Sequence, residues 1–281
     1  MNSKRIAIQG YPGAFHQIAV NCFHDGNPHE IVAVNTFDEL VEMVEDGADA
    51  DGGMMAIENT IAGSLLNNYQ LLNNSKLHIA GEVFLRIKQN LMALPGKKIE
   101  DLKEVHSHPI AIAQCRPFFK QYPFIKLVDT LDTALSAKLI REKGLEETGA
   151  IASTLAADLY QMNILAESIE ENKKNFTRFL VLEKGNPPRS SDQENKISIC
   201  FSLPHEVGSL YKVMGVLVQN EANMTKIQSV PMIGSEFKYL FFIDFEMSKK
   251  TNLIQTLGQI QQSTLGLKIL GQYQKGTYYD R

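Results

Sequence analysis

The hydrophobic pattern of the first 183 residues alternates between two periods. Short apolar stretches of strand length are followed by segments in which apolar side chains recur at helical spacing. Thr36 and Glu39 form a capping box, which predicts that a helix carrying Leu40 begins there. The expected strands are residues 4–9, 31–35, 53–57, 105–107, 150–152 and 179–183, and the other expected helices are residues 14–23, 110–119, 134–143 and 154–160. Strands separated by helices predict an α/β fold with largely parallel pairing.

A different order of elements follows after residue 195. Residues 197–203, 224–230, 237–247 and 268–273 have the pattern of strands, and residues 207–219 and 251–263 that of helices. This βαββαβ order predicts a ferredoxin-like sandwich. Gly, two Pro and polar residues make 184–195 the expected linker. The predicted domains are therefore residues 1–183 and 196–275, followed by a tail at 276–281.

Length, charge and apolar content limit the number of domains and the kinds of partner that we expect. The 281 residues are enough for about two domains. A net charge of −4 gives no electrostatic case for a nucleic-acid partner. No apolar run approaches the roughly 18 residues of a membrane span, and the N-terminus has no signal-peptide pattern. Cys22, Cys115 and Cys200 have no paired spacing and are expected to be buried thiols. We therefore expect a cytoplasmic protein without a membrane partner.

The sequence predicts neither a cofactor nor a metal site. The glycines Gly10 and Gly13 lack the GxGxxG spacing of a dinucleotide site, and no Walker A lysine follows them. The pair His106 and His108 has no Cys or carboxylate at a supporting spacing.

Small polar residues stand between strand and helix at five places in the first domain. Helix N-termini at the carboxyl ends of strands present free N–H groups that bind anions, which suggests a cradle for a carboxylated molecule. Simple helix capping explains each residue equally well. The five places are Gly10 and Gly13, Asn59 and Thr60, Ser107 to Pro109, Asp132 and Thr133, and Ser153 and Thr154.

The segment Asn175-Phe176-Thr177-Arg178-Phe179 is a sharper candidate. Arginine can clamp a carboxylate, and a neighbouring hydroxyl can donate a proton to a leaving oxygen. A strand start with an exposed arginine remains the alternative interpretation. Glu58 directly follows an expected buried strand. It is either a functional residue or part of a loop at the protein surface.

Five segments in order resemble the prephenate dehydratase family. Residues 175–179 match its N-x-T-R-F signature, and residues 57–63 match its P-I-E-N-[ST]-x-x-G loop apart from Ala56 in place of proline. Residues 107–115, 10–15 and 150–157 match three further motifs of the family. The second region resembles an ACT domain, with Gly208, Ser209 and Leu210 in place of its G-A-L motif. The matching pattern begins near residue 5, so we expect a monofunctional dehydratase.

The resemblance implies a cofactor-free reaction, in which prephenate loses water and carbon dioxide to give phenylpyruvate. Thr177 would assist departure of the hydroxyl, while Arg178 and helix N-termini would hold the carboxylates. The implied catalytic residues are Thr177, Arg178, Glu58 and Asn59, and the implied substrate-binding residues are Thr60, Ser107, Gln114, Asn175 and Phe179.

The resemblance also implies a fold and an effector. The catalytic domain would be periplasmic-binding-protein-like, with one lobe at about 1–80 with 177–183 and the other at 81–170. Paired ACT domains would form a homodimer or homotetramer and bind L-phenylalanine. The implied effector-binding residues are Val207, Gly208, Ser209, Leu210 and Asn223.

Three departures from the family pattern stand out. His16 replaces the usual Ser or Thr, which changes a polar contact at the first helix. Gln228 and Val230 replace both charges of the E-S-R-P motif, so we expect weaker coupling between effector and active site. Two other functions stay open. One is the same chemistry on arogenate, and the other is a non-catalytic small-molecule sensor.

Overall fold

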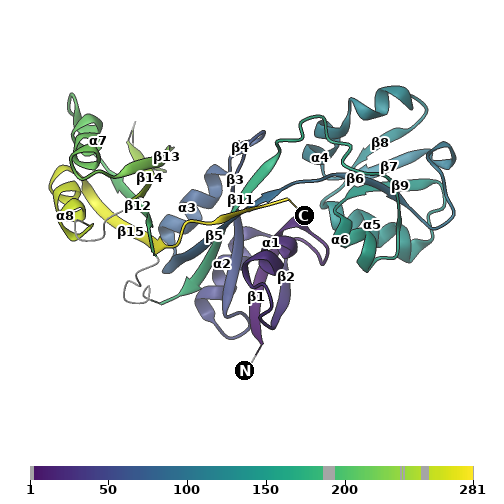
Figure 1. Ribbon diagram of the computed structural model, residues 1–281, viewed down its shortest axis with the longest axis horizontal. Coiled ribbons are helices and arrows are strands. Elements are labelled where there is room, and N and C mark those ends of the chain that lie inside the picture. Colours follow the sequence, from purple (N-terminus) through teal and green to yellow (C-terminus); the bar gives the residue numbers. More distant parts are fainter. Residues whose placement is uncertain (1–2, 186–193, 235, 237, 248–252, 281) are drawn as a thin grey trace.

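The computed structural model describes residues 3–185, 194–234, 236, 238–247 and 253–280. The chain forms a row of three units, which are two lobes and a smaller C-terminal domain (Figure 1). The first lobe has a sheet in the order β16-β5-β11-β3-β1-β2, and β4 pairs with β3. Its strands are β1 Lys4–Gln9, β2 His29–Val34, β3 Gly52–Asn59, β4 Gly63–Ser64, β5 Leu77–Arg86, β11 Phe176–Lys184 and β16 Thr277–Tyr279. Its helices are α1 Phe15–Phe23, α2 Phe37–Asp46 and α3 Leu66–Asn74.

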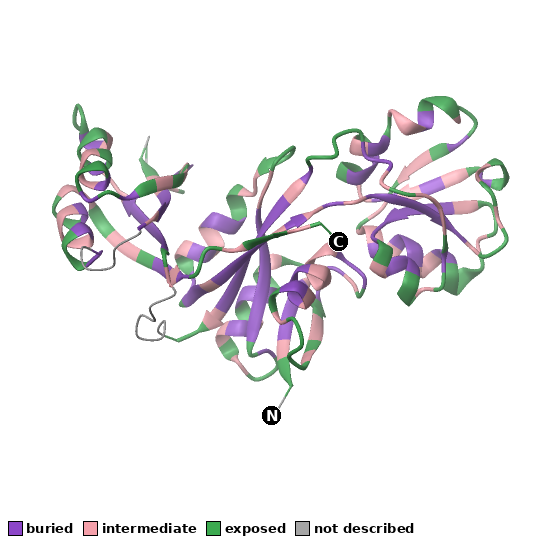
Figure 2. Ribbon diagram, in the orientation of Figure 1, coloured by how far each residue is buried: buried purple, intermediate pink, exposed green. Residues whose placement is uncertain are grey.

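Local sequence signals account for several of these elements. Thr36 Oγ1 accepts a hydrogen bond from Glu39 N at 3.1 Å, so the predicted capping box starts α2. The same helix ends at Gly47, whose φ of 76° lies in the left-handed region that glycine adopts readily. Strand β3 is buried over its first six residues, as expected for a strand covered on both faces (Figure 2).

The second lobe has its own sheet in the order β10-β6-β9-β7-β8. Its strands are β6 Asn90–Ala93, β7 Glu104–Ser107, β8 Lys126–Asp129, β9 Thr148–Ala152 and β10 Asn163–Ala166. Its helices are α4 Pro109–Cys115, α5 Thr133–Lys143 and α6 Thr154–Leu159, and two short 3-10 turns lie at Ile99–Asp101 and Phe118–Gln121. The chain passes between the lobes twice, from β5 to β6 and from β10 to β11 (Figure 1).

Two expectations about the lobes need correction. Residues 81–86 belong to β5 in the sheet of the first lobe, so the second lobe does not begin near residue 81. Pairing is mixed rather than largely parallel, because β11 runs antiparallel to both β3 and β5. The sequence pattern did not predict β5, which pairs with β11 at nine positions.

The C-terminal domain confirms the predicted βαββαβ order. Its elements are β12 Lys196–Ser202, α7 Ser209–Gln219, β13 Asn223–Pro231, β14 Tyr239–Glu246, α8 Leu253–Ser263 and β15 Leu265–Tyr273. The strands form one antiparallel sheet in the order β13-β14-β12-β15. The predicted linker 184–195 falls mostly on residues 186–193, which lie outside the described residues.

The expected tail is in fact a strand. Residues Thr277–Tyr279 form β16, which pairs in parallel with β5 of the first lobe. The Tyr278 ring stacks on Phe84 with a centroid distance of 4.5 Å. Figure 1 shows this yellow segment leaving the C-terminal domain and running along the first lobe toward the second.

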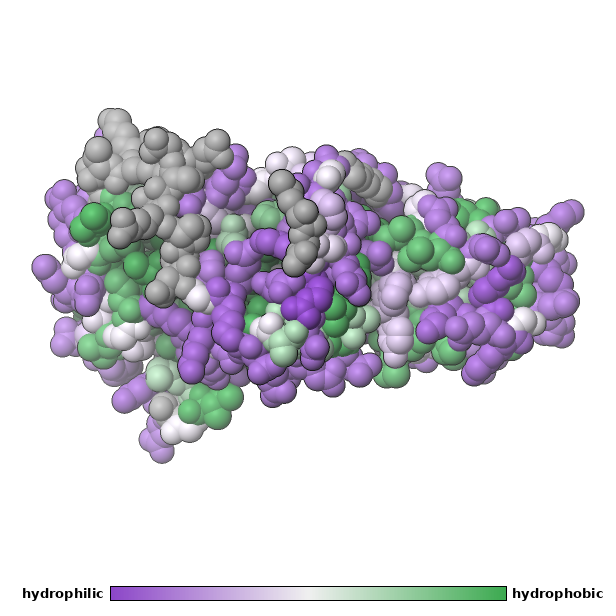
Figure 3. All heavy atoms as spheres, turned by 90° about the horizontal axis from the view of Figure 1, so that it is seen from below, coloured by the Kyte–Doolittle hydropathy of each residue, from purple (hydrophilic) through white to green (hydrophobic). Residues whose placement is uncertain are grey.

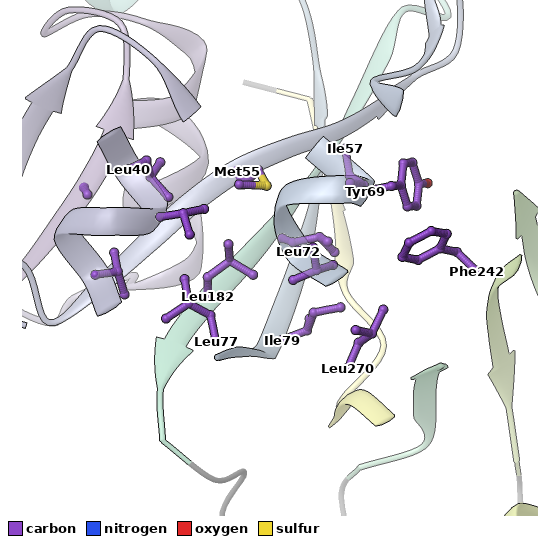
Figure 4. Close-up of a cluster of buried hydrophobic side chains, with 14 of the residues drawn as sticks. Leu40, Met55, Ile57, Tyr69, Leu72, Leu77, Ile79, Leu182, Phe242 and Leu270 are labelled. Atoms are coloured by element: carbon purple, nitrogen blue, oxygen red, sulfur yellow. The ribbon is translucent and has the colours of Figure 1, made fainter. Parts of the chain in front are cut away.

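One hydrophobic core joins the C-terminal domain to the first lobe. Leu72 and Ile79 of the first lobe share a buried cluster with Phe242 and Leu270 of the C-terminal sheet (Figure 4). Tyr69 and Phe242 meet edge to face at 4.9 Å. A shared core of this kind fixes the position of the C-terminal sheet against the back of the first lobe.

The surface hydropathy and the burial of the cysteines match what the sequence composition predicts. On the face in Figure 3, hydrophobic side chains form separate patches among hydrophilic ones. Within the described ranges, no helix is long and apolar enough to span a membrane. The thiols of Cys22, Cys115 and Cys200 are buried, as expected.

Candidate active site

A cavity of about 350 Å³ lies between the two lobes. The first lobe contributes Asn59, Thr177 and Phe179 to its wall, and the second lobe contributes Gln114 and Asp132. Its volume is in the range of small-molecule sites. The other residues around it are Gln9, Ala14, Phe15, His16, Ala56, Ala62, Gly63, Ser64, Leu65, Ile87, Gln89, His108, Ile110, Ala111, Leu131 and Thr133.

The centre of the cavity wall is a hydrogen-bonded pair on adjacent strands. Thr177 of β11 lies opposite Asn59 of β3 in the antiparallel register. Asn59 Nδ2 donates to Thr177 Oγ1 at 2.9 Å, and Asn59 Oδ1 accepts from Ile61 N and Ala62 N at 2.9 and 2.8 Å. These two acceptor contacts fix the amide orientation. Thr177 Oγ1 is therefore an acceptor towards Asn59, and its own proton is available to a ligand in the cavity.

A chain of amides connects this pair to the second lobe. Asn59 Nδ2 also donates to Asn175 Oδ1 at 2.8 Å. Asn175 Nδ2 in turn donates to Gln114 Oε1 on α4 at 3.0 Å. Asn175 is fully buried on the segment that crosses between the lobes. The predicted residues Asn59, Gln114, Asn175 and Thr177 are thus brought together across the cleft.

Three helix starts border the cavity. The first turn of α1, at Phe15 and His16, has no side-chain cap, because its N-cap residue is Ala14. The N-cap residues of α4 and α5 are His108 and Asp132, and each side chain accepts a hydrogen bond from the first turn of its own helix. The free N–H groups and positive dipole end of α1 make it the strongest anion-binding point of the three. Ser153 caps α6 and does not line this cavity.

Two polar side chains in the cavity wall hold buried atoms without a partner among the described residues. They are His16 Nε2 and Gln89 Oε1. Burial lowers the pKa of His16 to about 4, so the imidazole is neutral at physiological pH. Its ring lies edge to face against Phe179 at 5.0 Å. Unmatched polar atoms in a cavity are typical of a ligand site.

Arg178 does not face the cavity, contrary to expectation. Successive residues on a strand point to opposite faces, so Thr177 faces the cleft and Arg178 faces the C-terminal domain. Its guanidinium is buried and donates to Glu82 at 2.7 Å, Asp244 at 2.5 Å and Tyr273 OH at 3.0 Å. Arg178 therefore cannot hold a substrate carboxylate in this arrangement.

Glu58 lies on the same rear face. Its carboxylate pairs with Lys226 of β13 at 2.5 Å, and it is not among the cavity-lining residues. Two other predicted substrate contacts are also occupied elsewhere. Ser107 Oγ donates to Ile151 O at 2.7 Å, and Thr60 Oγ1 donates to Lys174 O at 2.9 Å. Glu58, Ser107 and Thr60 thus stabilise the frame of the cleft rather than its wall.

A second cavity, of about 550 Å³, lies in the C-terminal domain. Ser209 and Leu210 line it, in agreement with their expected place. Val207 is fully exposed next to it, and Gly208 caps α7 with a φ of 82°. Asn223 does not line this cavity, because it lies at the start of β13 opposite Glu246.

Sequence reasoning missed several wall residues. Gln9 and Gln89 belong to no motif that was assigned a role, and His108 lies within the junction at residues 107–109 without a role of its own. Asp132 was noted only as a helix start, and His16 only as a departure. Proximity to strand ends was the signal that could have identified them, since three of the five strand-to-helix junctions place a residue in the cavity wall. Among the described residues, no cluster of His, Cys, Asp or Glu could hold a metal ion.

Comparison with known proteins agrees with this arrangement. Residues 6–187 match the family described as prephenate dehydratase. Arogenate dehydratase 2 of Petunia hybrida is 37% identical over 96% of this chain and 71% of its own length. The bifunctional chorismate mutase/prephenate dehydratase of Aquifex aeolicus is 34% identical over 96% of this chain and 74% of its own length.

Solved structures show the same fold. The prephenate dehydratase of Arthrobacter aurescens in complex with L-Phe has a TM-score of 0.83 and 25% identity, over 96% of this chain and 90% of that one. GqqA, described as a novel type of quorum quenching acylase, has a TM-score of 0.86 and 31% identity, over 97% and 98%. The family match covers most of the two-lobed part, and the relatives extend through the C-terminal domain. The chain therefore belongs to the prephenate dehydratase family.

Proposed function

We propose that this protein catalyses the decarboxylating dehydration of prephenate to phenylpyruvate, a step toward L-phenylalanine. The observation that carries the proposal is the Thr177 hydroxyl, which Asn59 orients inside the cavity between the lobes. Family membership and relatives named prephenate or arogenate dehydratase support the same reaction.

The reaction needs little more than positioning and one proton. The bond between the ring and its carboxylate breaks, and its electron pair becomes a ring double bond as carbon dioxide leaves. The ring hydroxyl departs on the far side of the ring and takes up a proton, so that water forms. Aromatisation supplies the driving force, and no cofactor takes part.

The cavity residues have distinct roles in this scheme. Thr177 donates a hydrogen bond or relays a proton to the departing hydroxyl, because Asn59 leaves the proton of the threonine free. The uncapped start of α1 holds a carboxylate. Phe179 packs against the ring, and Gln114 and Asn175 fix the distance between the lobes. A closed cleft excludes water and strengthens these polar contacts.

We further propose that L-phenylalanine regulates the enzyme from the C-terminal cavity. Ser209 and Leu210 line that cavity, with Val207 and Gly208 at its edge. Asn223 is too far along β13 to line the cavity of its own chain, so its contact would come through a partner in a homodimer or homotetramer. Three buried thiols accord with a cytoplasmic enzyme.

An assay of product formation tests this proposal. We expect the purified full-length protein to convert prephenate to phenylpyruvate, or arogenate to phenylalanine, with added L-phenylalanine lowering the rate. Absence of product from both substrates would reject catalysis and leave the non-catalytic sensor. Turnover without any effect of millimolar phenylalanine would reject the effector site alone.

A further inference from the structure

The charge of the active-site cavity bears on which of the two candidate substrates it binds better. Asp132 is the one Asp or Glu among the residues described around the cavity, and no Lys or Arg lines it. Prephenate carries two carboxylates and a neutral ketone. A fixed carboxylate beside such a ligand repels it unless something positive lies between them.

Asp132 is held in place by its own helix. Its Oδ1 accepts a hydrogen bond from Leu135 N at 2.8 Å, which caps the eleven-residue helix α5. Its Oδ2 faces Gly10 on the opposite lobe, because a Cβ built on that glycine would lie 3.0 Å from the oxygen. The carboxylate thus reaches across the opening between the lobes.

Asp132 has no cationic partner in an ion pair among the residues that the structure describes. Burial raises its pKa. The titratable groups that face it are His108 at the start of α4 and Tyr160 after α6. Gln89 Oε1, a second acceptor in the cavity wall, is also buried without a partner. The cavity therefore contains two acceptors, Asp132 and Gln89 Oε1, to which a cationic group of a ligand could donate hydrogen bonds.

We propose that Asp132 binds the α-ammonium group of an amino-acid substrate, so that this cleft prefers arogenate to prephenate. Arogenate has an ammonium where prephenate has a ketone, and the two are otherwise alike. This inference rests on the proposed dehydratase function and names its substrate.

The ammonium of arogenate and the ketone of prephenate differ in how they interact with a carboxylate. An ammonium bound to a carboxylate forms a charge-assisted hydrogen bond, whereas a ketone has no N–H to donate. A site built around such a bond rejects the analogue that lacks it, because the buried acceptor stays unpaired. Arogenate loses carbon dioxide and water by the same bond changes and leaves phenylalanine. No amino donor is then needed after this step, and the product is the proposed effector itself.

Asp132→Asn tests the inference without removing the helix cap. Asparagine caps a helix as well as aspartate does, so the variant changes charge and little else. We expect the wild type to have a higher kcat/KM for arogenate than for prephenate. In Asp132→Asn, kcat/KM falls for arogenate and rises for prephenate, so that their ratio drops about 10- to 100-fold, as for one lost charged hydrogen bond.

Controls separate this result from a structural effect. Asp129→Asn, on the exposed end of β8, keeps the wild-type ratio. Asp132→Ser offers a second capping residue without charge, and it gives the same fall in the ratio if Asp132→Asn folds poorly. A wild type that prefers prephenate, or a ratio that falls less than tenfold in both variants, overturns the inference. Turnover of neither substrate by the wild type rejects the dehydratase function itself, which is a different outcome.

Discussion

Asn59 is the residue on which the orientation of Thr177 depends. Its amide donates to the threonine hydroxyl, while its carbonyl oxygen is held by two backbone N–H groups. The hydroxyl proton is consequently directed by contacts that exist before a ligand binds. Such preorganisation is a main source of catalytic power in enclosed sites.

Replacing Asn59 by Ala removes this control while leaving the Thr177 hydroxyl present. We expect kcat to fall about 100-fold, in the range of a lost acid–base contribution. Steady-state kinetics on prephenate and arogenate measure the change. Asn67→Ala, at an exposed position of α3, is the matched control and keeps kcat. Equal rates for both variants would contradict the role of Asn59.

His16 makes stability depend on pH. Burial lowers its pKa to about 4 from the ordinary value of 6.5. Between these two pH values the imidazole is protonated in the unfolded chain and neutral in the folded chain. The folded state therefore loses stability as pH falls from about 6.5 to about 4, by at most about 3 kcal/mol.

Chemical denaturation of wild type and His16→Ser at several pH values isolates this effect. The other histidines contribute equally to both proteins and cancel. We expect the stability difference to move in favour of the variant as the pH is lowered through this window. A difference that stays constant from pH 7 to pH 4 would show that the imidazole is protonated in the folded state.

At the scale of elements, strands β3 and β11 divide their residues between two faces. Asn59 and Thr177 face the cleft, and Glu58 and Arg178 face the C-terminal domain. The sequence motifs placed all four residues in one site, because neighbouring positions in a motif do not show to which face of the strand each side chain points. The alternation of side chains along a strand does show this, and it separates the two pairs once β11 is known to be a strand.

The rear face carries a buried charge network. Arg178 contacts Glu82 and Asp244, and Lys196 donates to Glu82 at 2.8 Å. Ser198 donates to Asp244 at 2.5 Å, and Tyr273 also contacts Arg178. The network joins β5 and β11 to three strands of the C-terminal sheet.

We expect Arg178→Met to lower the free energy of unfolding by about 3–5 kcal/mol. The variant leaves the buried carboxylate of Asp244 without its cation, which is the costly half of breaking a buried pair. Urea denaturation measures the loss. Lys103→Met breaks the exposed pair with Glu147 and is expected to cost less than about 1 kcal/mol. Similar losses in both variants would contradict the distinction.

At the scale of the whole molecule, the catalytic sheet and the C-terminal domain are one packed body. The βαββαβ order could be predicted from the periodicity of the sequence, whereas the two lobes were implied only by the resemblance to the family. The periodicity did not predict helix α3 or strands β5, β6, β8, β10 and β16. Of these strands, β5 and β16 pair with partners that are distant in the chain. Gly271 shows how close the packing is, because a Cβ there would lie 2.3 Å from Ile79 O.

Removing residues 277–281 deletes β16 and its contacts with β5. We expect the amides of residues 83–85 to lose protection, with hydrogen exchange at least about tenfold faster, because an edge strand exposes its N–H groups. Exchange followed by mass spectrometry measures this. Residues 126–129, at the far edge of the second lobe, serve as the internal control. Unchanged exchange at residues 83–85 would show that β16 adds no protection.

The proposed catalysis depends on the hydroxyl of Thr177 in the cleft between the lobes. Its most direct test is the kcat/KM of Thr177→Val beside that of Thr177→Ser, since valine keeps the shape and serine keeps the hydroxyl. The proposed role of the hydroxyl predicts that kcat/KM falls about 100- to 1,000-fold in Thr177→Val and less than about tenfold in Thr177→Ser, on whichever substrate the wild type prefers. A Thr177→Val enzyme within about threefold of the wild type would contradict it.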